Sequence, residues 1–147
     1  MGQTILLVED VEADVFFFRR ALSRLGSDVS VRVVSNGAEA QRYMEGQPPY
    51  DNRNYFQLPS LIVCDFKMPR RTGADFLEWL RQCRHFDDIS FVLFSGSVLL
   101  EEEELAMKLG ANLYLRKSGD FADMLDRTRN ILELLEPRRN TAPRYPG

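Results

Sequence analysis

Polar side chains follow four of the five short apolar runs of the chain, at the position where each run ends. They are Glu9 with Asp10, Asp65, Ser95 and Lys117. Three carboxylates that lie close together repel one another and favour a hard divalent cation, and Mg²⁺ takes carboxylate oxygens and water in an octahedral shell. The residue types therefore indicate a Mg²⁺ site, provided that the fold brings the three acids together.

With a metal bound, one carboxylate of such a cluster can attack phosphorus, as in aspartyl-phosphate chemistry. The metal and the ammonium of Lys117 would neutralise the transferred group, and the Ser95 hydroxyl would donate a hydrogen bond to it. Taken singly, these residues have simpler interpretations, since a lone Asp after a strand usually caps or turns the chain. Their joint occurrence at successive strand ends is what indicates phosphoryl transfer.

The apolar runs alternate with segments of helical period, which predicts five strand–helix units. The predicted strands are 5–8, 29–34, 61–64, 91–94 and 113–115, and helical spacing covers 15–25, 38–44, 76–80, 101–109 and 121–135. Continuous apolar strands between helices are typical of a parallel sheet covered on both faces. The carboxyl ends of parallel strands lie along one edge, so the polar residues above are expected to converge there.

The bulk composition bounds the function classes. A chain of 147 residues fits one domain, and a formal net charge of −3 argues against general binding to nucleic acid, which needs a basic face. No run is long and apolar enough to span a bilayer, so no membrane partner is expected. Two cysteines make no disulfide framework and suggest a reducing, cytoplasmic setting.

Several other residues have a structural interpretation. We expect Cys64 to be a buried, inert thiol, because it lies within an apolar run, and His85 to be a surface residue. The acidic run Glu101–Glu104 is interpreted as a solvated helix start with favourable placement at the helix dipole. Phe16, Phe17 and Phe18 cannot all face one core. Phe18 fits the apolar stripe of its helix, so we expect Phe16 or Phe17 to be partly exposed and a candidate docking surface.

Four motifs give the chain a resemblance to the receiver domains of two-component response regulators. The motifs are Leu-Leu-Val-Glu-Asp at 6–10, Val-Cys-Asp-Phe-Lys-Met-Pro at 63–69, Leu-Phe-Ser-Gly-Ser at 93–97 and Tyr-Leu-Arg-Lys at 114–117. The resemblance covers residues 3–136. It implies a flavodoxin-like α/β fold, a doubly wound parallel sheet of five strands in the order 2-1-3-4-5.

The resemblance also implies roles for single residues. It implies Mg²⁺ bound by Glu9, Asp10, Asp65 and the main-chain carbonyl of Lys67. It implies that Asp65 is the phosphoacceptor and that two further side chains hold the phosphoryl group. These are Ser95 and Lys117. Tyr114 corresponds to the switch aromatic, and Tyr114 and Ser95 together are expected to form the switch that responds to the phosphoryl group.

A narrower resemblance is to the small response regulators that serve bacterial phytochromes. The loop 47–59 is longer than in minimal receivers, and Ser118 stands where most receivers have a proline. Ser118 thus removes the restraint that would favour a cis peptide there. Thr72 stands where many receivers have Asp, a departure that should affect only the loop. We expect residues 137–147 to form a flexible tail without an output domain.

The partners and activity follow from the same resemblance. It implies a cytoplasmic phosphorelay protein that a sensor histidine kinase phosphorylates, with the phytochromes as candidate kinases. The phosphorylated protein then signals by a change of shape to an unknown downstream protein. It implies no DNA binding and no enzymatic activity beyond its own phosphoryl transfer and autodephosphorylation. A homodimer through the fourth helix, fifth strand and fifth helix is one arrangement that it allows.

Three alternatives stay open at the level of sequence. A metal-dependent phosphatase with a nucleophilic Asp would place its two acids differently, since Lys67 stands where a second acid after Asp65 is needed. A flavodoxin-like cofactor binder would need a phosphate loop after the first strand, and the acidic residues 9–12 would repel phosphate. A degenerate receiver that never takes phosphate would not need the complete set of acids, Ser95 and Lys117.

Overall fold

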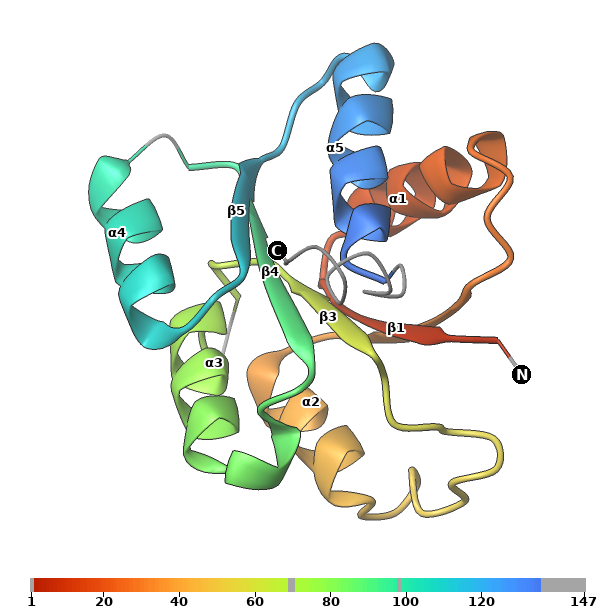
Figure 1. The fold of residues 1–147 in the computed structure, drawn as a ribbon, viewed down its shortest axis with the longest axis vertical. Helices are drawn as coiled ribbons and strands as arrows, with labels where there is room; N and C mark the ends of the chain where they lie inside the picture. The colour runs from red at the N-terminus through yellow and green to blue at the C-terminus, as the bar shows by residue number, and fades with distance from the viewer. Residues whose placement is uncertain (1, 69–70, 98, 136–147) are drawn as a thin grey trace, which may run out of the picture.

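The computed structural model describes residues 2–68, 71–97 and 99–135, in which strands and α-helices alternate (Figure 1). The strands are β1 (Thr4–Val8), β2 (Ser30–Val34), β3 (Leu61–Cys64), β4 (Ser90–Ser95) and β5 (Leu113–Arg116). The helices are α1 (Glu12–Arg24), α2 (Gly37–Glu45), α3 (Gly73–Gln82), α4 (Leu100–Leu109) and α5 (Phe121–Glu133), with a 3-10 turn at Arg84–Phe86. All neighbouring strands are parallel, in the order β2-β1-β3-β4-β5. The predicted fold class and strand order are confirmed.

Three details differ from the sequence-based expectations. The pair Asn36-Gly37 predicts a turn of the chain, but the Asn36 side chain caps α2 by accepting a hydrogen bond from the Glu39 N–H at 2.9 Å. The apolar residues of 121–135 predict a core face made of Leu125, Ile131, Leu132 and Leu135, which leaves out the fully or almost fully buried Met124 and Thr128. The 3-10 turn was not predicted. The tail 137–147 lies outside the described residues.

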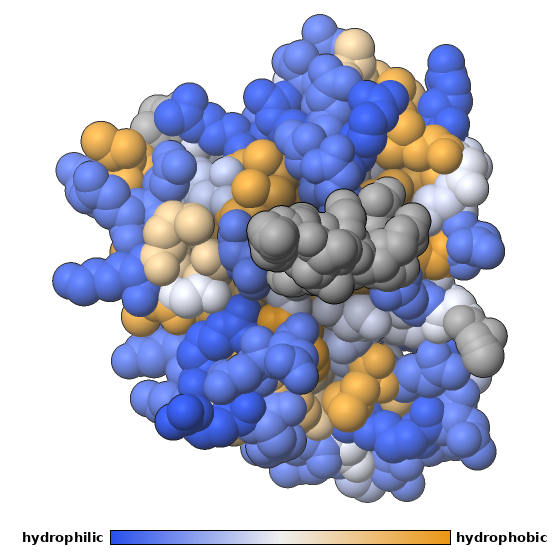
Figure 2. Space-filling model, in the orientation of Figure 1, coloured by the Kyte–Doolittle hydropathy of each residue, from blue (hydrophilic) through white to orange (hydrophobic). Residues whose placement is uncertain are grey.

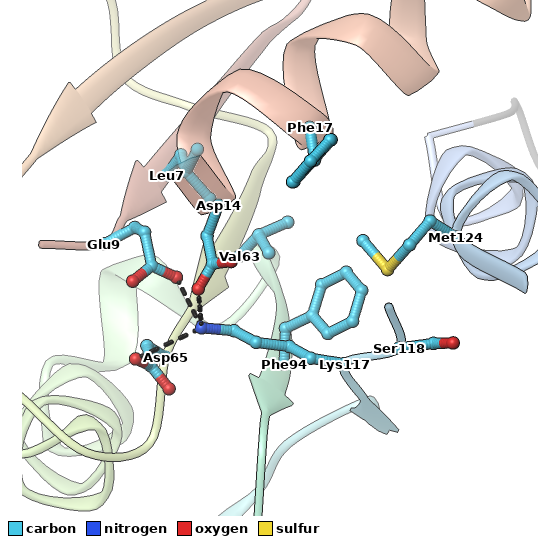
Figure 3. Close-up of a pocket in the computed structure, with 10 residues that line it drawn as sticks. All are labelled: Leu7, Glu9, Asp14, Phe17, Val63, Asp65, Phe94, Lys117, Ser118 and Met124. Atoms are coloured by element: carbon cyan, nitrogen blue, oxygen red, sulfur yellow. Dashed lines mark hydrogen bonds and ion pairs between the residues drawn. The ribbon is translucent and has the colours of Figure 1, made fainter. Parts of the chain in front are cut away.

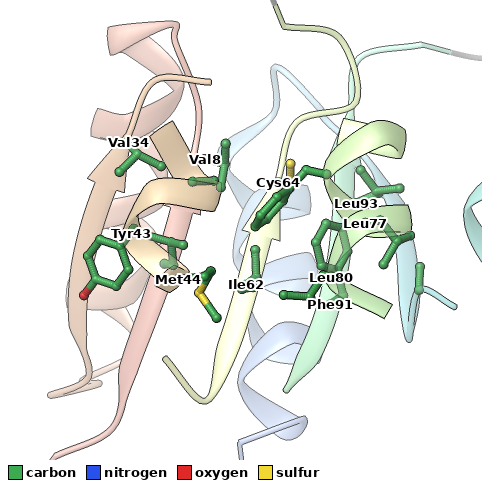
Figure 4. Packing of buried hydrophobic residues seen from close by; sticks show 14 of the residues in the cluster. Val8, Val34, Tyr43, Met44, Ile62, Cys64, Leu77, Leu80, Phe91 and Leu93 are labelled. Atoms are coloured by element: carbon green, nitrogen blue, oxygen red, sulfur yellow. The ribbon is translucent and has the colours of Figure 1, made fainter. Parts of the chain in front are cut away.

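Two apolar clusters hold the helices on opposite faces of the sheet, because alternate residues of each strand point to opposite sides. On one face, α1 and α5 pack through residues such as Phe18, Leu22 and Ile131. On the other, α2, α3 and α4 cover a larger cluster that Figure 4 shows from close by. The larger cluster includes Val8, Tyr43, Met44, Ile62, Phe76, Leu77, Leu80, Phe91 and Leu93. The layered sheet is therefore buried on both sides, as its continuous apolar strands indicated.

Helix α3 begins directly behind the loop that follows β3. The Gly73 N–H donates to the Phe66 carbonyl at 2.9 Å, and a Cβ at position 73 would collide with the carbonyl oxygen of Asp65. Glycine is the residue that permits this approach. Thr72 accepts a hydrogen bond from the Asp75 N–H at 3.1 Å, and the Asp75 carboxylate accepts one from the Thr72 N–H. Thr72 is thus the cap of a capping box and does more than shape the loop.

Exposed apolar side chains gather on two helices. On α1, Phe16 and Phe17 are 57% and 45% exposed whereas Phe18 is buried, which confirms that only Phe18 of the three faces the core. Around α4, Leu99, Leu100, Leu105 and Met107 are exposed, and Figure 2 shows apolar surface among hydrophilic atoms in that region. None of the described helices is long and apolar enough to cross a membrane.

Candidate functional site

Glu9, Asp10 and Asp65 form an acidic cluster at one edge of the sheet. One carboxylate oxygen from each lies within 4.8 Å of the others. The register of the sheet causes this, because Val8 pairs with Cys64 and the next residue of each strand carries a carboxylate. Backbone hydrogen bonds fix both positions, since the Asp65 N–H donates to the Val8 carbonyl at 3.0 Å and the Glu9 N–H donates to the Val34 carbonyl at 2.9 Å. The convergence predicted from the strand ends is confirmed for these three acids.

Lys117, which follows β5, reaches into the same edge. Its Nζ lies 2.9 Å from the Glu9 carboxylate, 3.4 Å from that of Asp65 and 2.7 Å from that of Asp14 (Figure 3). Asp14 is on the first turn of α1 and was not identified from the sequence. An acidic residue in the first turn of a helix is so common that its type alone gave no signal. The ammonium is therefore shared among three carboxylates.

The charges at this edge do not balance. Burial raises the pKa of Glu9 above its ordinary value, although the hydrogen bond and charge of Lys117 act in the opposite direction. Burial likewise raises the pKa of Asp65 and outweighs Lys117. Burial alone would lower the pKa of Lys117, but hydrogen bonds to Asp14 and Glu9 and the charge of Asp65 raise it. Four carboxylates with one ammonium leave excess negative charge, most of which a divalent cation would offset.

The donor set fits a hard divalent metal. Glu9 and Asp65 are buried, whereas Asp10 is exposed, so a bound ion could keep contact with solvent on one side. Carboxylate oxygens together with water are the ligands that such cations take. The Lys67 side chain is exposed, and the ligand role of its carbonyl stays a prediction.

A narrow pocket lies on the Lys117 side of the cluster. Its polar wall includes Glu9, Asp14, Asp65 and Lys117, and the apolar wall includes Phe17 from α1 and Met124 from α5 (Figure 3). Ser118 also lines it, and the Ser118 hydroxyl donates to the Asp123 carboxylate at 3.0 Å. The residue after the lysine thus anchors the start of α5 by a side-chain hydrogen bond.

Ser95 and Tyr114 meet at a different carboxylate. The Ser95 hydroxyl and the Tyr114 hydroxyl both donate to Oε1 of Glu102, each at 3.1 Å. Glu102 lies in the first turn of α4 and is only 6% exposed. The interpretation of Glu101–Glu104 as a solvated helix start is therefore wrong for Glu102. Consecutive helical residues point in different directions, so one acid of the run faces the sheet while its neighbours face solvent.

The remaining interpretations agree with the structure. Cys64 is fully buried, and burial raises the pKa of its thiol well above the ordinary value. His85 is exposed, away from the acidic edge. Within the described residues, neither gives a second site that could take part in phosphoryl transfer.

Comparisons with known proteins decide the family. The family model for the response regulator receiver domain matches residues 5–129. The chain belongs to this family. As a receiver domain, it is a phosphoacceptor component of two-component signalling, with an acidic cluster of the kind that binds a divalent metal. The phosphatase and cofactor-binder alternatives are thereby set aside.

Individual relatives are distant in sequence but close in structure. The receiver is 26% identical to response regulator Rcp1 of Synechocystis over 88% of this chain and 86% of Rcp1. It is 29% identical to stress response regulator protein 1 of Clavispora lusitaniae, of which it spans 62%. The phosphorylated cyanobacterial phytochrome response regulator RcpA superposes with a TM-score of 0.81 at 26% identity, over 90% and 93% of the two chains. The Mn²⁺-bound form of Rcp1 superposes with a TM-score of 0.79 at 26% identity, over 88% and 91%.

Proposed function

We propose that this receiver accepts a phosphoryl group on Asp65 from a sensor histidine kinase and passes that state to a protein partner by changing shape. The observation that carries the proposal is the position of the Asp65 carboxylate. It is buried at the end of the central strand, belongs to the acidic cluster and lies 3.4 Å from the ammonium of Lys117. A nearby cation and limited access of water both favour phosphoryl transfer to a carboxylate nucleophile.

The transfer itself involves few groups of the protein. A carboxylate oxygen of Asp65 forms a bond to phosphorus while the bond from phosphorus to the donor breaks, and the electron pair stays on the donor atom. With a phosphohistidine donor, that atom is an imidazole nitrogen. The ammonium of Lys117 can pair with the phosphoryl oxygens after transfer, because it already lies near Asp65. The Ser95 hydroxyl would supply a hydrogen bond after it leaves Glu102.

We propose Mg²⁺ as the metal, held by Glu9, Asp10 and Asp65 with the Lys67 carbonyl as a further ligand. When bound, it supplies positive charge that offsets the charge of the transferred group. The Mn²⁺-bound form of Rcp1 supports a divalent ion in this kind of domain. Phosphorylation should stop in EDTA and return with Mg²⁺. Asp10→Asn should weaken Mg²⁺ binding, because it removes one charge from the cluster while leaving the buried acids in place.

The direct test of Asp65 is the site of modification. The protein is incubated with acetyl phosphate and Mg²⁺, and intact mass and sensitivity to hydroxylamine identify an acyl phosphate. Wild-type protein and the control Asp88→Asn, at an exposed aspartate, should gain one labile phosphate. Asp65→Asn should gain none, and a labile phosphate on that variant would disprove the assignment.

We further propose a phytochrome-type kinase as the donor and the cytoplasm as the place of action. The likeness to the phytochrome response regulator RcpA and the long loop 47–59 support the first. The free cysteines Cys64 and Cys83 support the second. Phosphotransfer profiling against a panel of purified histidine kinases tests the donor, and rapid transfer from phytochrome kinases alone is the expected outcome.

The surface formed by α4, β5 and α5 is where we propose that the signal is read, by a downstream protein or by a second copy of the chain. Exposed Leu99, Leu100, Leu105 and Met107 support this, because apolar side chains gathered on one helix favour protein contact. Light scattering after size-exclusion chromatography, with and without beryllofluoride, measures whether a homodimer forms. We also propose that the chain catalyses only its own phosphorylation and autodephosphorylation.

A further inference from the structure

Glu102 is unusual among the acids of the chain because it is buried outside the acidic cluster. Within the described residues, only Glu9, Asp65 and Glu102 are buried carboxylates. Its neighbours Glu101 and Glu103 on the same helical turn are exposed. A charged side chain is costly to bury unless it is hydrogen-bonded, so its partners determine what it does.

The partners of Glu102 are the two residues of the proposed switch. One carboxylate oxygen accepts from Ser95 at the end of β4 and from Tyr114 on β5, each at 3.1 Å. Hydrogen bonds to an ionised acceptor are stronger than those between neutral groups. A serine hydroxyl carries a single proton, so Ser95 cannot donate to Glu102 and to a phosphoryl oxygen at the same time.

We infer that Glu102 is a positioning residue that holds the Ser95 hydroxyl and the Tyr114 ring in the unphosphorylated arrangement, so that a phosphoryl group must compete with Glu102 for the Ser95 proton. The inference rests on the proposed function of Asp65. It makes the ease of phosphorylation a property of α4, which carries Glu102, as well as of the acidic edge.

The competition also explains how α4 would respond. When Ser95 turns toward Asp65, the buried carboxylate of Glu102 loses one of its two donors, and an under-bonded buried charge is unfavourable. The only other buried side chain of α4 is Ala106, and the Leu99 cap position supplies no side-chain hydrogen bond. Little else therefore keeps the first turn of α4 in place once that hydrogen bond is lost, and Glu102 can move toward solvent with Tyr114 released.

The test measures the beryllofluoride concentration at half-saturation, at fixed Mg²⁺, by amide chemical shifts. Glu102→Gln keeps the shape and an acceptor oxygen but removes the charge, and Glu103→Gln is the matched control that removes the same charge from the exposed side of the helix. Because a charge-assisted hydrogen bond is about twice as strong as a neutral one, Glu102→Gln should lower the half-saturating concentration about fivefold. Glu103→Gln should leave it within about twofold. An unchanged or raised value for Glu102→Gln, or an equal change in the control, overturns the inference.

A double-mutant cycle shows whether Glu102 acts through Ser95. In a Ser95→Ala background, the effect of Glu102→Gln on half-saturation should be clearly smaller than in the wild type, because the contested proton is gone. Equal effects in the two backgrounds overturn the inference. Should Glu102→Gln not fold, Glu102→Met fills a similar volume with only a weak acceptor, and it should lower the half-saturating concentration below that of the wild type.

Controls separate this inference from the proposed function. The wild type must bind beryllofluoride in a Mg²⁺-dependent manner that Asp65→Asn abolishes, and failure here contradicts the proposed function itself. Normal binding by the wild type with no shift in the Glu102 variants contradicts only the role of Glu102. A merely structural role would destabilise the free and the beryllofluoride-bound protein equally, which urea unfolding of both forms would reveal.

Discussion

Helices α3 and α4 have ten residues each and cover the same face of the sheet, yet they are attached by different forces. α3 buries Phe76, Leu77 and Leu80 and begins at a capping box. α4 buries only Glu102 and Ala106 and has no side-chain cap. Apolar contact and a satisfied helix end fix α3 whatever the state of the site. α4 adds only Ala106 and the partly buried Leu109 to the apolar cluster, and hydrogen bonds from Ser95 and Tyr114 hold its first turn, so the position of that turn can depend on the state of the site.

The difference between α3 and α4 indicates which helix of a receiver can move without losing buried apolar area. Buried apolar area is lost only when a helix separates from the core, which makes α3 a poor candidate for a signal. Hydrogen bonds can exchange partners at little net cost when a new acceptor arrives. Under the proposed function, we therefore expect α4 to report phosphorylation, because its attachment uses a hydroxyl that the phosphoryl group can also use.

The largest effect should come from emptying the core beneath α3. Phe76 is fully buried, and Phe76→Ala should lower the free energy of unfolding by about 3–5 kcal/mol. Leu105→Ala on α4 removes an exposed side chain and should change it by no more than about 0.5 kcal/mol. Urea unfolding followed by circular dichroism measures both. Similar losses for the two variants would abolish the contrast between the helices.

A smaller effect should follow from removing the cap of α3. Thr72→Ala deletes the acceptor for the Asp75 N–H, which should cost about 1 kcal/mol. The loss should appear in urea unfolding with an unchanged denaturant slope, since the buried surface stays the same. No measurable loss would mean that the capping box contributes little and that apolar burial alone fixes α3.

Giving α4 the cap that it lacks should have a still smaller effect. Leu99→Ser places a capping hydroxyl before Leu100 and should stabilise the unphosphorylated protein by about 0.5 kcal/mol. Hydrogen exchange of the first backbone amides of α4 should slow by the factor to which this free energy corresponds. The exchange of the amides of α3 should be unaffected. Slower exchange in α3 instead would contradict a local origin.

The smallest effect should be a dependence of the free energy of unfolding on pH. It should come from the ionisable Glu9 and not from the apolar contacts of α3. The pKa of Glu9 is raised in the folded protein, so the folded state keeps its proton to higher pH than the unfolded state, and ionisation opposes folding. In EDTA, the stability of Glu9→Gln relative to the wild type should therefore increase as pH rises from the ordinary glutamate pKa through the raised one. The cost of Phe76→Ala should be constant over the same range. A relative stability that falls with pH would reverse the assigned sign.

The sequence was sufficient to predict which site residues lie at the strand ends. It was insufficient to predict which helical residues face the site. Glu9, Asp65 and Lys117 could be placed together because each follows a strand, and parallel register brings strand ends to one edge. Ser95 ends β4 at the same edge, but its hydroxyl donates to Glu102, which strand register alone does not predict. The fold class and the strand order were predictable for the same reason.

Asp14 and Glu102 escaped prediction because helices supply them. Whether a helical side chain faces the sheet depends on how the helix is rotated about its axis, and packing against distant elements decides that rotation. In α4 the apolar residues do not define a single face, since Leu100, Leu105 and Met107 are exposed. No local pattern could therefore distinguish Glu102 from the three other acids of its run.

The contact between Gly73 and Asp65 gives α3 a mechanical role. Because no side chain separates the first residue of α3 from the carbonyl oxygen of Asp65, Asp65 lies against a helix that apolar contacts and a capping box hold in place. Under the proposed function, α3 would keep the reacting carboxylate stationary while α4 moves relative to it. A methyl group at position 73 would collide with the Asp65 carbonyl oxygen and displace the loop that carries Asp65. The segment proposed to accept the phosphoryl group would then no longer be held in place by α3.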